Sequence, residues 1–358
     1  MEAEYLVVGS GLTGSVIAHL LNKAKKDVLV LERRSEIGGN IYSEIHNSGI
    51  VFHKYGPHFF RTNSKKIWDF VNAFDTFYSH KHIVRTSMNG NLEPWPLNKK
   101  FLERKYKLKW HNDFLKTPSN FEEAALSHMP YEIYEGYVKF YTQKQWGINP
   151  KFLTPDLAAR LYIPEKETPY FSPHKYQGLP KRGYTNLIKQ MLKNIPTITK
   201  LDFLKYPDKI SYKNLIFTGP IDEFFNFKLG KLVYRAQKRR SIFLPNINQF
   251  QNFSVINFPE RKPRYIRTIE WKRMMPQESI KKIKGTLVTY ETPYSPENPD
   301  QYEYPMQDKK NRDLFNAYRK LSSKKNLFFA GRLGEYAYYD MDIAIEKAME
   351  LTRAILKK

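Results

Sequence analysis

The sequence predicts an α/β protein made of a doubly wound parallel sheet, an inserted helical region and an antiparallel sheet. Three observations predict this fold. The chain opens with a buried strand, a glycine-rich turn, an amphipathic helix and a second strand, the start of a βαβ unit. Its middle has helical periodicity over residues 99–163, and residues 231–310 alternate as strands do. With 358 residues, and about 150 residues per domain, the chain has room for two or three domains.

The glycine-rich turn has the sequence GSGLTG at residues 9–14 and directly follows the predicted strand 4–8. An amphipathic helix comes next, and residues 28–31 form a second buried strand that ends at Glu32. Glycines permit the tight turn and let backbone amides approach a pyrophosphate at the helix N-terminus. An acid about 20 residues further on accepts hydrogen bonds from the adenosine ribose. Together these features predict a Rossmann-like dinucleotide-binding domain.

Two further segments favour FAD over NAD. Residues 33–40, RRSEIGGN, place a Gly-Gly turn shortly after Glu32, which resembles the second cofactor segment of flavoproteins in the amine-oxidase-like superfamily. Residues 326–331 form a predicted strand ending in glycine, and Asp340 then opens a helix with Met341 and Ile345 on one face. Such flavoproteins have a late strand-to-helix turn at the ribityl–phosphate end of the flavin. An ordinary C-terminal helix is the alternative for this segment taken alone.

These segments divide the chain into three predicted domains. The FAD-binding domain is discontinuous and comprises residues 1–80, 183–230 and 322–358. The helical domain comprises residues 99–163, and either Ser119 or Asn120 caps one of its helices. The antiparallel sheet domain comprises residues 81–98, 164–182 and 231–321. Residues 154–165 lack a long apolar face and contain Pro155 and Pro164, so we expect a mobile lid there.

The charge balance indicates anionic ligands. Lysine and arginine number 59 against 36 acidic residues, a formal net charge of +23, and such a charge attracts nucleotides, nucleic acids or acidic lipids. The basic residues are scattered, with no compact tract beyond short runs such as residues 238–240. A nucleic-acid site requires a concentrated basic stripe, so we expect a solvated basic surface and no nucleic-acid partner. The chain has no cysteine, which excludes disulfides and zinc–thiolate sites.

No segment has the pattern of a targeting or membrane sequence. Residues 5–21 are apolar, but acidic residues precede them and glycines and His19 interrupt them, unlike a signal peptide. No other stretch approaches the roughly 18 apolar residues of a membrane span. We therefore expect a cytoplasmic protein without a membrane span.

The sequence lacks the motifs of several catalytic classes. The sequence has no GxSxG elbow, no P-loop and no HExxH motif. None of the nine histidines pairs with another at zinc spacing, so we expect no metal site, and we expect His80 and His82 to be solvated. Arginines and aromatic residues are prominent in the middle and last third. Guanidinium groups bind diphosphates well, and aromatic faces bind nucleobases.

Seven segments, in order, resemble UDP-galactopyranose mutases over nearly the full length of the chain. They are HKYGPHFF at 53–60, YTQKQWG at 141–147, residues 170–178, FTGPID at 217–222, YR at 234–235, YIRTIE at 265–270 and GRLGEYAYYDM at 331–341.

The resemblance implies a flavoenzyme without net redox change that interconverts UDP-galactopyranose and UDP-galactofuranose. In this family, N5 of reduced FAD attacks the anomeric carbon, UDP leaves, and the sugar of the adduct opens and recloses as a furanose. The cofactor thus supplies the nucleophile. A cytoplasmic homodimer is also implied, as are an external reductant, either NAD(P)H or a reductase, and a role in cell-surface polysaccharide biosynthesis.

The resemblance also assigns residues. Catalytic roles fall to His58 beside the flavin and to Arg160 and Arg267, which would clamp the diphosphate. The expected cofactor-binding residues are Gly9, Gly11, Thr13, Gly14, Glu32, Arg33, Gly39, Asn40, His58, Phe59, Arg332, Asp340 and Met341. The expected substrate-binding residues are Tyr141, Thr142, Trp146, Arg160, Tyr170, Arg235, Asn257, Arg267, Tyr304 and Tyr338.

One departure concerns the sugar. Many bacterial members carry a second histidine where this chain has Arg61. The same reaction on UDP-N-acetylgalactosamine or on a dTDP-deoxysugar is therefore an alternative. An amine-oxidase-like flavin oxidoreductase and a basic nucleic-acid-binding protein are the rival classes, and the pair Arg160 and Arg267 favours a diphosphate substrate over an oxidase substrate.

Overall fold

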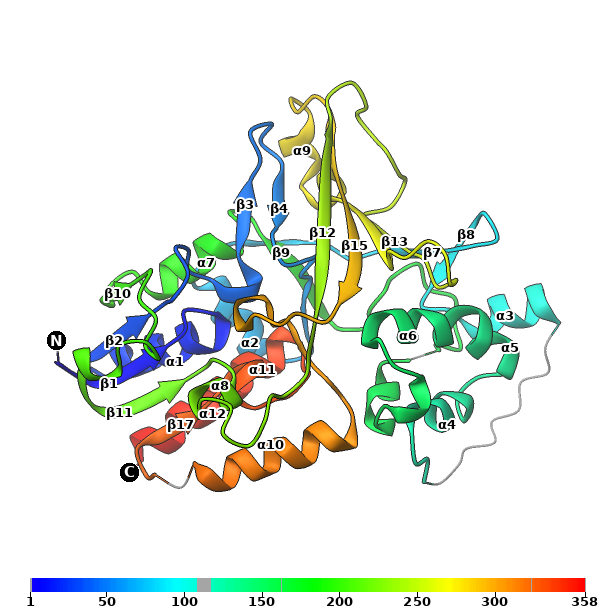
Figure 1. Ribbon diagram of the computed structural model, residues 1–358. Helices are drawn as coiled ribbons and strands as arrows, with labels where there is room; N and C mark the ends of the chain where they lie inside the picture. The colour runs from blue at the N-terminus through cyan, green and yellow to red at the C-terminus, as the bar shows by residue number, and fades with distance from the viewer. Residues whose placement is uncertain (1, 108–116, 162, 323, 358) are drawn as a thin grey trace.

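The computed structural model describes residues 2–107, 117–161, 163–322 and 324–357. A parallel sheet with its helices forms the base, a long two-stranded arm rises above it, and a helical region lies to one side (Figure 1). Both ends of the described chain lie in the base (Figure 1). No helix within the described ranges is long and apolar enough to cross a membrane.

The base sheet has five parallel strands in the order β10-β2-β1-β11-β17. The strands are β1 (Glu2–Val8), β2 (Val28–Leu31), β10 (Thr197–Ile198), β11 (Ser211–Phe217) and β17 (Leu327–Phe329). Because β1 lies between β2 and β11, the strand order reverses beside it, which is where doubly wound sheets bind their ligands. Gly9, Glu32 and Thr218 directly follow three of these strands and therefore meet at that edge. The predicted doubly wound fold is confirmed.

Helices cover one face of this sheet. Val28 and Val30 of β2 pack with α1 (Leu12–Lys23), α7 (Tyr184–Met191) and α12 (Met341–Leu356), whereas Leu29 and Leu31 face a second apolar cluster that includes Phe203. Successive residues of β2 face opposite sides of the sheet, and both sides are buried. This explains why all four of its residues are apolar. The predicted apolar stripe of the last helix is also confirmed, because Ile345 and its neighbours along α12 are buried.

A second sheet has seven strands in the order β16-β12-β15-β14-β13-β7-β8. The strands are β7 (Val84–Met88), β8 (Asn91–Trp95), β12 (Tyr234–Leu244), β13 (Val255–Asn257), β14 (Arg267–Glu270), β15 (Thr286–Tyr294) and β16 (Tyr304–Pro305). Neighbouring strands are antiparallel except β13 and β7, which pair in parallel. The sheet predicted to be antiparallel is therefore mixed. The reason is that β7 joins it from a distant part of the chain.

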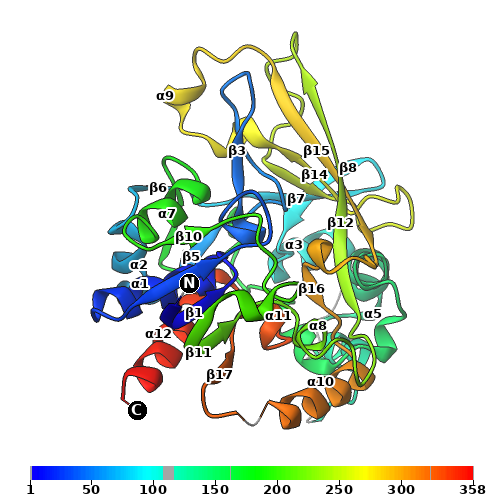
Figure 2. The same cartoon turned by 60° about the vertical axis from the view of Figure 1, so that its left-hand side comes forward.

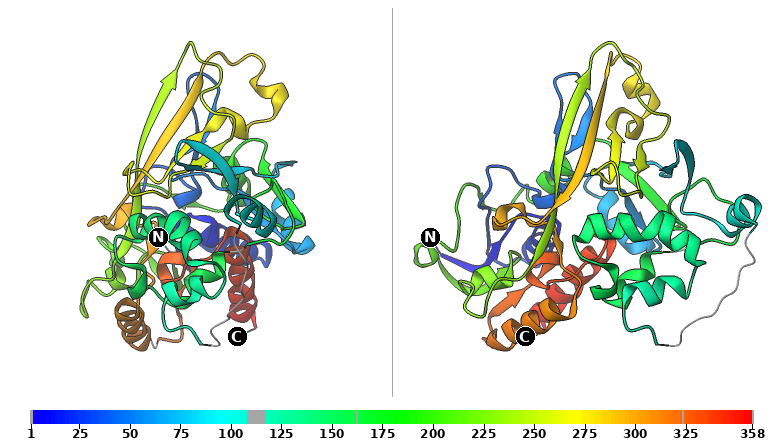
Figure 3. Two further views of the ribbon diagram at one scale, coloured as in Figure 1. Left: turned by 90° about the vertical axis from the view of Figure 1, so that its right-hand side faces the viewer. Right: turned by 45° about the vertical axis from the view of Figure 1, so that its right-hand side comes forward.

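Short helices make up the side region (Figure 3). They are α3 (Lys99–Tyr106), α4 (Phe121–Leu126), α5 (Tyr131–Ile133), a π-helical turn (Tyr134–Lys139), α6 (Phe140–Trp146) and two 3₁₀ helices (Pro150–Phe152 and Pro155–Arg160). Of the two predicted caps, Asn120 is the N-cap of α4, since its side chain accepts a hydrogen bond from the amide of Glu123 at 3.0 Å. The predicted lid contains the second 3₁₀ helix.

The remaining elements connect these parts. The hairpin of β3 (Ser43–Ile45) and β4 (Val51–His53) rises beside β12 and β15 (Figures 1 and 2). A three-stranded sheet joins β5 (Phe60–Thr62), β9 (Tyr176–Pro180) and β6 (Phe77–Ser79). Thus β9, expected in the antiparallel sheet, pairs with strands from the first segment of the chain instead. The other helices are α2 (Lys65–Asn72), α8 (Ile221–Phe224), α9 (Gln277–Ile280), α10 (Lys309–Leu321) and α11 (Gly331–Gly334).

Candidate active site

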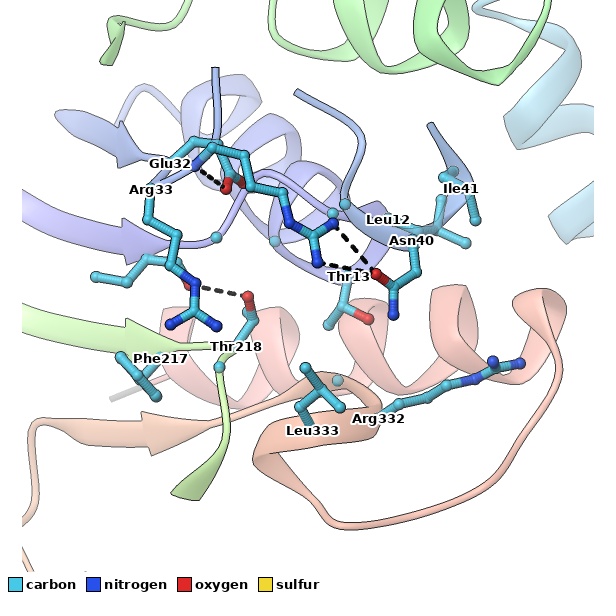
Figure 4. Close-up of a pocket in the computed structure, with 18 of the residues that line it drawn as sticks. Leu12, Thr13, Glu32, Arg33, Asn40, Ile41, Phe217, Thr218, Arg332 and Leu333 are labelled. Atoms are coloured by element: carbon cyan, nitrogen blue, oxygen red, sulfur yellow. Dashed lines mark hydrogen bonds between the residues drawn. The ribbon is translucent and has the colours of Figure 1, made fainter. Parts of the chain in front are cut away.

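A pocket of about 1120 Å³ lies where the strands of the base sheet end. We call it the dinucleotide pocket. Figure 4 shows Glu32 and Asn40 on one side of it and Phe217, Thr218 and Leu333 on the other. Eleven of the predicted cofactor residues line it: Gly9, Gly11, Thr13, Gly14, Glu32, Arg33, Gly39, Asn40, His58, Arg332 and Met341. The remaining two, Phe59 and Asp340, lie in the neighbouring pocket described below.

The glycines of this pocket are required by close backbone approach. A Cβ on Gly14 would lie 2.0 Å from the carbonyl oxygen of Gly9, and a Cβ on Gly39 would lie 2.9 Å from Cα of Gly11. Gly39 also has a φ of +54°, which favours glycine. The two glycine segments therefore pack against each other and leave the start of α1 open to the pocket. Its first amides are free to bind phosphate oxygens.

Charged residues line the rim of the same pocket. Glu32 is buried, and its carboxylate accepts hydrogen bonds from the amide and hydroxyl of Ser10, at 3.0 and 2.7 Å, and from the amide of Arg34 at 2.9 Å. These bonds fix the carboxylate at the end of β2, where a ribose would meet it. The predicted residue Arg33 is held by Glu223 at 2.8 Å and by Asp300 at 2.6 Å.

A second pocket, of about 1110 Å³, opens from the first. We call it the arginine pocket, since Arg61, Arg160, Arg267 and Arg332 all line it. The two pockets share His58, Arg332 and Met341. A dinucleotide lying along the first pocket would therefore reach the second at these three residues.

His58 lies at this junction with an unused polar atom. Its Nδ1 is enclosed and has no hydrogen-bond partner among the described residues. Burial lowers the pKa of the imidazole well below its ordinary value, and the nearby His53 and Arg332 lower it further. The ring is therefore neutral at physiological pH, with a nitrogen available for a bound group. An orphaned buried nitrogen between the two pockets fits a cofactor ring at this place.

The floor of the arginine pocket is one row of the seven-stranded sheet. Thr86, Asn257 and Arg267 oppose one another across β7, β13 and β14. Directly opposed residues project from the same face of a sheet, so all three side chains face the pocket. Tyr137 and Tyr141 of the helical region also line this pocket.

Two predicted arginines approach this pocket from different elements. Arg267 lies on β14, and Arg160 ends the 3₁₀ helix of the predicted lid. The guanidinium of Arg160 lies 3.8 Å from the centre of the Tyr338 ring, and it donates to Asp340 at 2.9 Å. Asp340 also accepts from Arg61 at 2.6 Å. Burial alone raises the pKa of Asp340, but the charges of Arg160 and Arg61 outweigh it and hold that pKa well below its usual range.

Four predicted substrate residues do not line the arginine pocket. Thr142 and Trp146 are buried in the packing of α6, and Tyr170 lines a smaller cavity nearby. Arg235 is buried outside the pocket and has partners of its own. Its guanidinium donates to the carbonyls of Gln145 at 2.9 Å and Lys144 at 3.1 Å and to the Ser295 hydroxyl at 2.5 Å. Each of its three nitrogens makes one hydrogen bond, so Arg235 braces the end of α6, and its phosphate contact stays a prediction.

The structure adds pocket residues that the sequence did not single out. Tyr137 lies four residues before Tyr141, a spacing that indicates a shared helix face. Arg61, which the sequence indicated only as a departure from the family pattern, directly follows the segment 53–60. The prediction that His80 and His82 are solvated is wrong. His82 is buried, stacks on Phe59 with ring centres 3.4 Å apart and lines the pocket, and Nε2 of His80 is buried as well.

Comparisons with known proteins agree with this geometry. The family model for UDP-galactopyranose mutase matches residues 136–338, which include half of the residues that line the arginine pocket, among them Arg160 and Arg267. UDP-galactopyranose mutase from Mycoplasma genitalium is 33% identical over 390 residues, covering 97% of this chain and 94% of that protein. The chain belongs to the UDP-galactopyranose mutase family. It is therefore an isomerase of nucleotide sugars, of the UDP-galactopyranose or dTDP-fucopyranose type.

Other relatives bear on the substrate and the fold. The dTDP-fucopyranose mutase of Escherichia coli is 29% identical and covers 98% of both chains, and a probable UDP-galactopyranose mutase of Klebsiella pneumoniae is 30% identical over 96% of this chain and 92% of that protein. A model for NAD(P)-binding Rossmann-like domains matches residues 7–74. A crystal structure of reduced UDP-galactopyranose mutase superposes with a TM-score of 0.80 at 15% identity, covering 100% of this chain and 94% of that one, which shows a common fold.

Proposed function

We propose that the protein interconverts UDP-galactopyranose and UDP-galactofuranose with reduced FAD as its cofactor. One observation carries the proposal: Arg160 and Arg267 enter one pocket from a lid and from a sheet, and that pocket opens into a dinucleotide pocket at His58. Two guanidinium groups match the two phosphates of a nucleoside diphosphate. The family model and the Mycoplasma and Klebsiella relatives favour the UDP-galactose pair.

The residues of the dinucleotide pocket fit FAD. The start of α1 would receive the pyrophosphate, Glu32 would accept from the adenosine ribose, and the free Nδ1 of His58 would meet the flavin. When bound and reduced, FAD supplies the nucleophile that displaces UDP from the anomeric carbon. Arg332 and Met341 line both pockets, so they would hold the flavin at the entrance to the arginine pocket.

The chain's own residues would bind and orient the substrate. Arg267, fixed on β14, and Arg160, on the lid, would hold the diphosphate and stabilise the charge that UDP gains as the bond to the sugar breaks. Burial raises the pKa of Tyr304 and of Tyr141, so both hydroxyls stay protonated and can donate to oxygen atoms. The face of Tyr141 would support the base.

The sugar is the less constrained part of the proposal. Arg61 occupies the arginine pocket close to His58 and is paired with Asp340. A mutase of UDP-N-acetylgalactosamine or of dTDP-fucopyranose would need the same diphosphate clamp, and one relative that covers 98% of this chain is named a dTDP-fucopyranose mutase. An amine-oxidase-like oxidase would not need two arginines in its substrate pocket.

A panel of nucleotide sugars tests the proposal. The dithionite-reduced protein is incubated with UDP-galactopyranose, UDP-N-acetylgalactosamine and dTDP-fucopyranose, and products are separated chromatographically. We expect the fastest pyranose–furanose exchange with UDP-galactopyranose, and no stoichiometric consumption of reductant. Faster exchange with another sugar nucleotide would identify that compound as the substrate instead. Full activity with oxidised flavin under air would contradict the role of reduced FAD. In the cell we propose a cytoplasmic homodimer that is reduced by NAD(P)H or a reductase.

A further inference from the structure

A buried ion chain lies behind the substrate arginine. Arg239, Glu291 and Arg267 oppose one another directly across β12, β15 and β14, so their side chains share one face of the sheet. Arg239 Nε donates to Oε1 of Glu291 at 2.8 Å, and Arg267 Nε donates to Oε2. The Glu291 side chain is fully buried. Each oxygen of one carboxylate is thus bound to a different arginine.

The two arginines differ in what remains free. The terminal nitrogens of Arg239 donate to both oxygens of Glu303, at 2.7 and 2.8 Å, and Arg239 does not line the arginine pocket. The terminal nitrogens of Arg267 have no partner among the described residues, and Arg267 lines the pocket. Glu291 therefore fixes Arg267 by its inner nitrogen and leaves the outer pair for a ligand.

We propose that Arg239 is a positioning residue that makes Arg267 available to the diphosphate, an inference that rests on the proposed function. Arg239 occupies Oε1 of Glu291 and limits that carboxylate to a single bond with Arg267. Without Arg239, both oxygens of Glu291 are free to form a bidentate pair with Arg267, which is the geometry that guanidinium and carboxylate prefer. That pair would turn the outer nitrogens of Arg267 away from the pocket and neutralise the charge that attracts phosphate.

The charge count and the packing support this role. The charges of the two arginines and two glutamates in this ion chain balance. Removal of Arg239 therefore leaves an excess of negative charge beside Arg267. Gly56 closes the site from above: a Cβ there would lie 2.6 Å from Oε1 of Glu291 and 3.0 Å from Nη2 of Arg239. The backbone leading to His58 therefore packs on the ion pair and leaves Glu291 no other partner on that side.

Binding of UDP and of uridine to the oxidised holoenzyme tests the proposal, because only UDP has the diphosphate. We expect Arg239→Met to weaken the affinity for UDP by about 10-fold to 100-fold, by analogy with the loss of partners that orient metal ligands, and to leave the affinity for uridine unchanged. Arg240→Met is the matched control, since Arg240 is the next residue of β12 and is exposed. Its UDP affinity should equal that of the wild type.

A double variant tests whether Arg239 affects UDP binding through Glu291. If Arg239 acts through Glu291, Arg239→Met should cost no further UDP affinity in a Glu291→Gln background. Unchanged UDP affinity in Arg239→Met, or an equal loss for uridine, would overturn the proposal. If Arg239→Met does not fold, Arg239→Gln removes the same charge with a polar side chain and should show the same selective loss.

The proposed function is judged separately, on the wild type. A preference for dTDP over UDP would change the assigned nucleotide, and the comparison of dTDP with thymidine would then test Arg239 by the same criterion. Failure of the wild type to bind any nucleoside diphosphate would overturn both.

Discussion

Asp340 holds Arg160 at the edge of the arginine pocket, with Nη2 of the arginine 2.9 Å from Oδ1 of a carboxylate 180 residues further along the chain. The ring of Tyr338 lies beneath the same guanidinium. The lid arginine is thus already paired with an anion in the pocket. Only Nη2 of Arg160 bonds Asp340, so the other N–H groups of the guanidinium can donate to the diphosphate that we propose as its ligand.

Replacement of Arg160 should impair turnover as well as binding. Loss of a desolvated charged contact costs on the order of 2–5 kcal/mol, and UDP gains charge as it leaves. We therefore expect Arg160→Ala to lower kcat and raise KM. Arg160→Lys should recover little, because an ammonium cannot replace a planar fork. Steady-state kinetics measure this, with the exposed Arg353→Ala as control. Wild-type kcat/KM in Arg160→Ala, or loss of its flavin, would refute it.

The protein should carry FAD, and Gly14→Ala should lose it. The new methyl group would lie 2.0 Å from the carbonyl oxygen of Gly9, which forces the glycine turn apart. The cofactor released by denaturation is identified by chromatography, and flavin absorbance per protein gives the occupancy. Gly136→Ala is the matched control, since its Cβ would meet only Met88 at 3.7 Å. Finding FMN alone, or full FAD content in Gly14→Ala, would contradict the prediction.

Arg235→Met should weaken uridine and UDP by the same factor. Arg235 binds the carbonyls at the end of α6, the helix that carries Tyr141, and it does not line the arginine pocket. Its loss leaves buried carbonyls unsatisfied at about 1–3 kcal/mol each, so the melting temperature should fall as well. Ligand titration and thermal unfolding measure both effects. A loss of affinity for UDP but not for uridine would favour the direct phosphate contact that the family resemblance predicts.

Acid should destabilise the protein below neutral pH. Burial lowers the pKa of His53 to about 3 and that of His80 to about 4, and it also lowers the pKa of His82. Between these values and the unfolded value of about 6.5, only the unfolded chain binds the protons. Stability is therefore complete above about pH 6.5 and is lost as pH falls, by about 1.4 kcal/mol per pH unit for each histidine.

Urea unfolding at several pH values measures that slope. His80→Gln should reduce the slope by one histidine's share, because the Nε2 of His80 is buried without a partner among the described residues. An unfolding free energy that stays constant from about pH 6.5 to pH 5 would contradict the prediction.

Local signals predicted much of the fold and part of the site. The strand, glycine turn and acid at Glu32 lie within one short segment, so their joint function could be recognised before any contact was known. Arg61 and Asp340 lie 279 residues apart, and no local pattern indicates that they pair. The contacts of Arg235 with α6 were not predicted, because an arginine that caps a helix and one that binds phosphate look alike in sequence. The burial of His82 depends on its stacking with Phe59, which only the tertiary fold creates.

The position of β17 and α12 has a consequence for synthesis. β1 is made first, yet one of its two neighbours in the sheet, β11, emerges some two hundred residues later, and β17 and α12 follow later still. A growing chain therefore displays the glycine turn long before Arg332 and Met341 exist to close the pocket. Because domains fold as units during translation, we expect this one to wait until its last helix leaves the ribosome. Cofactor capture then follows the synthesis of α12, and a nascent chain stalled before β17 should bind no flavin.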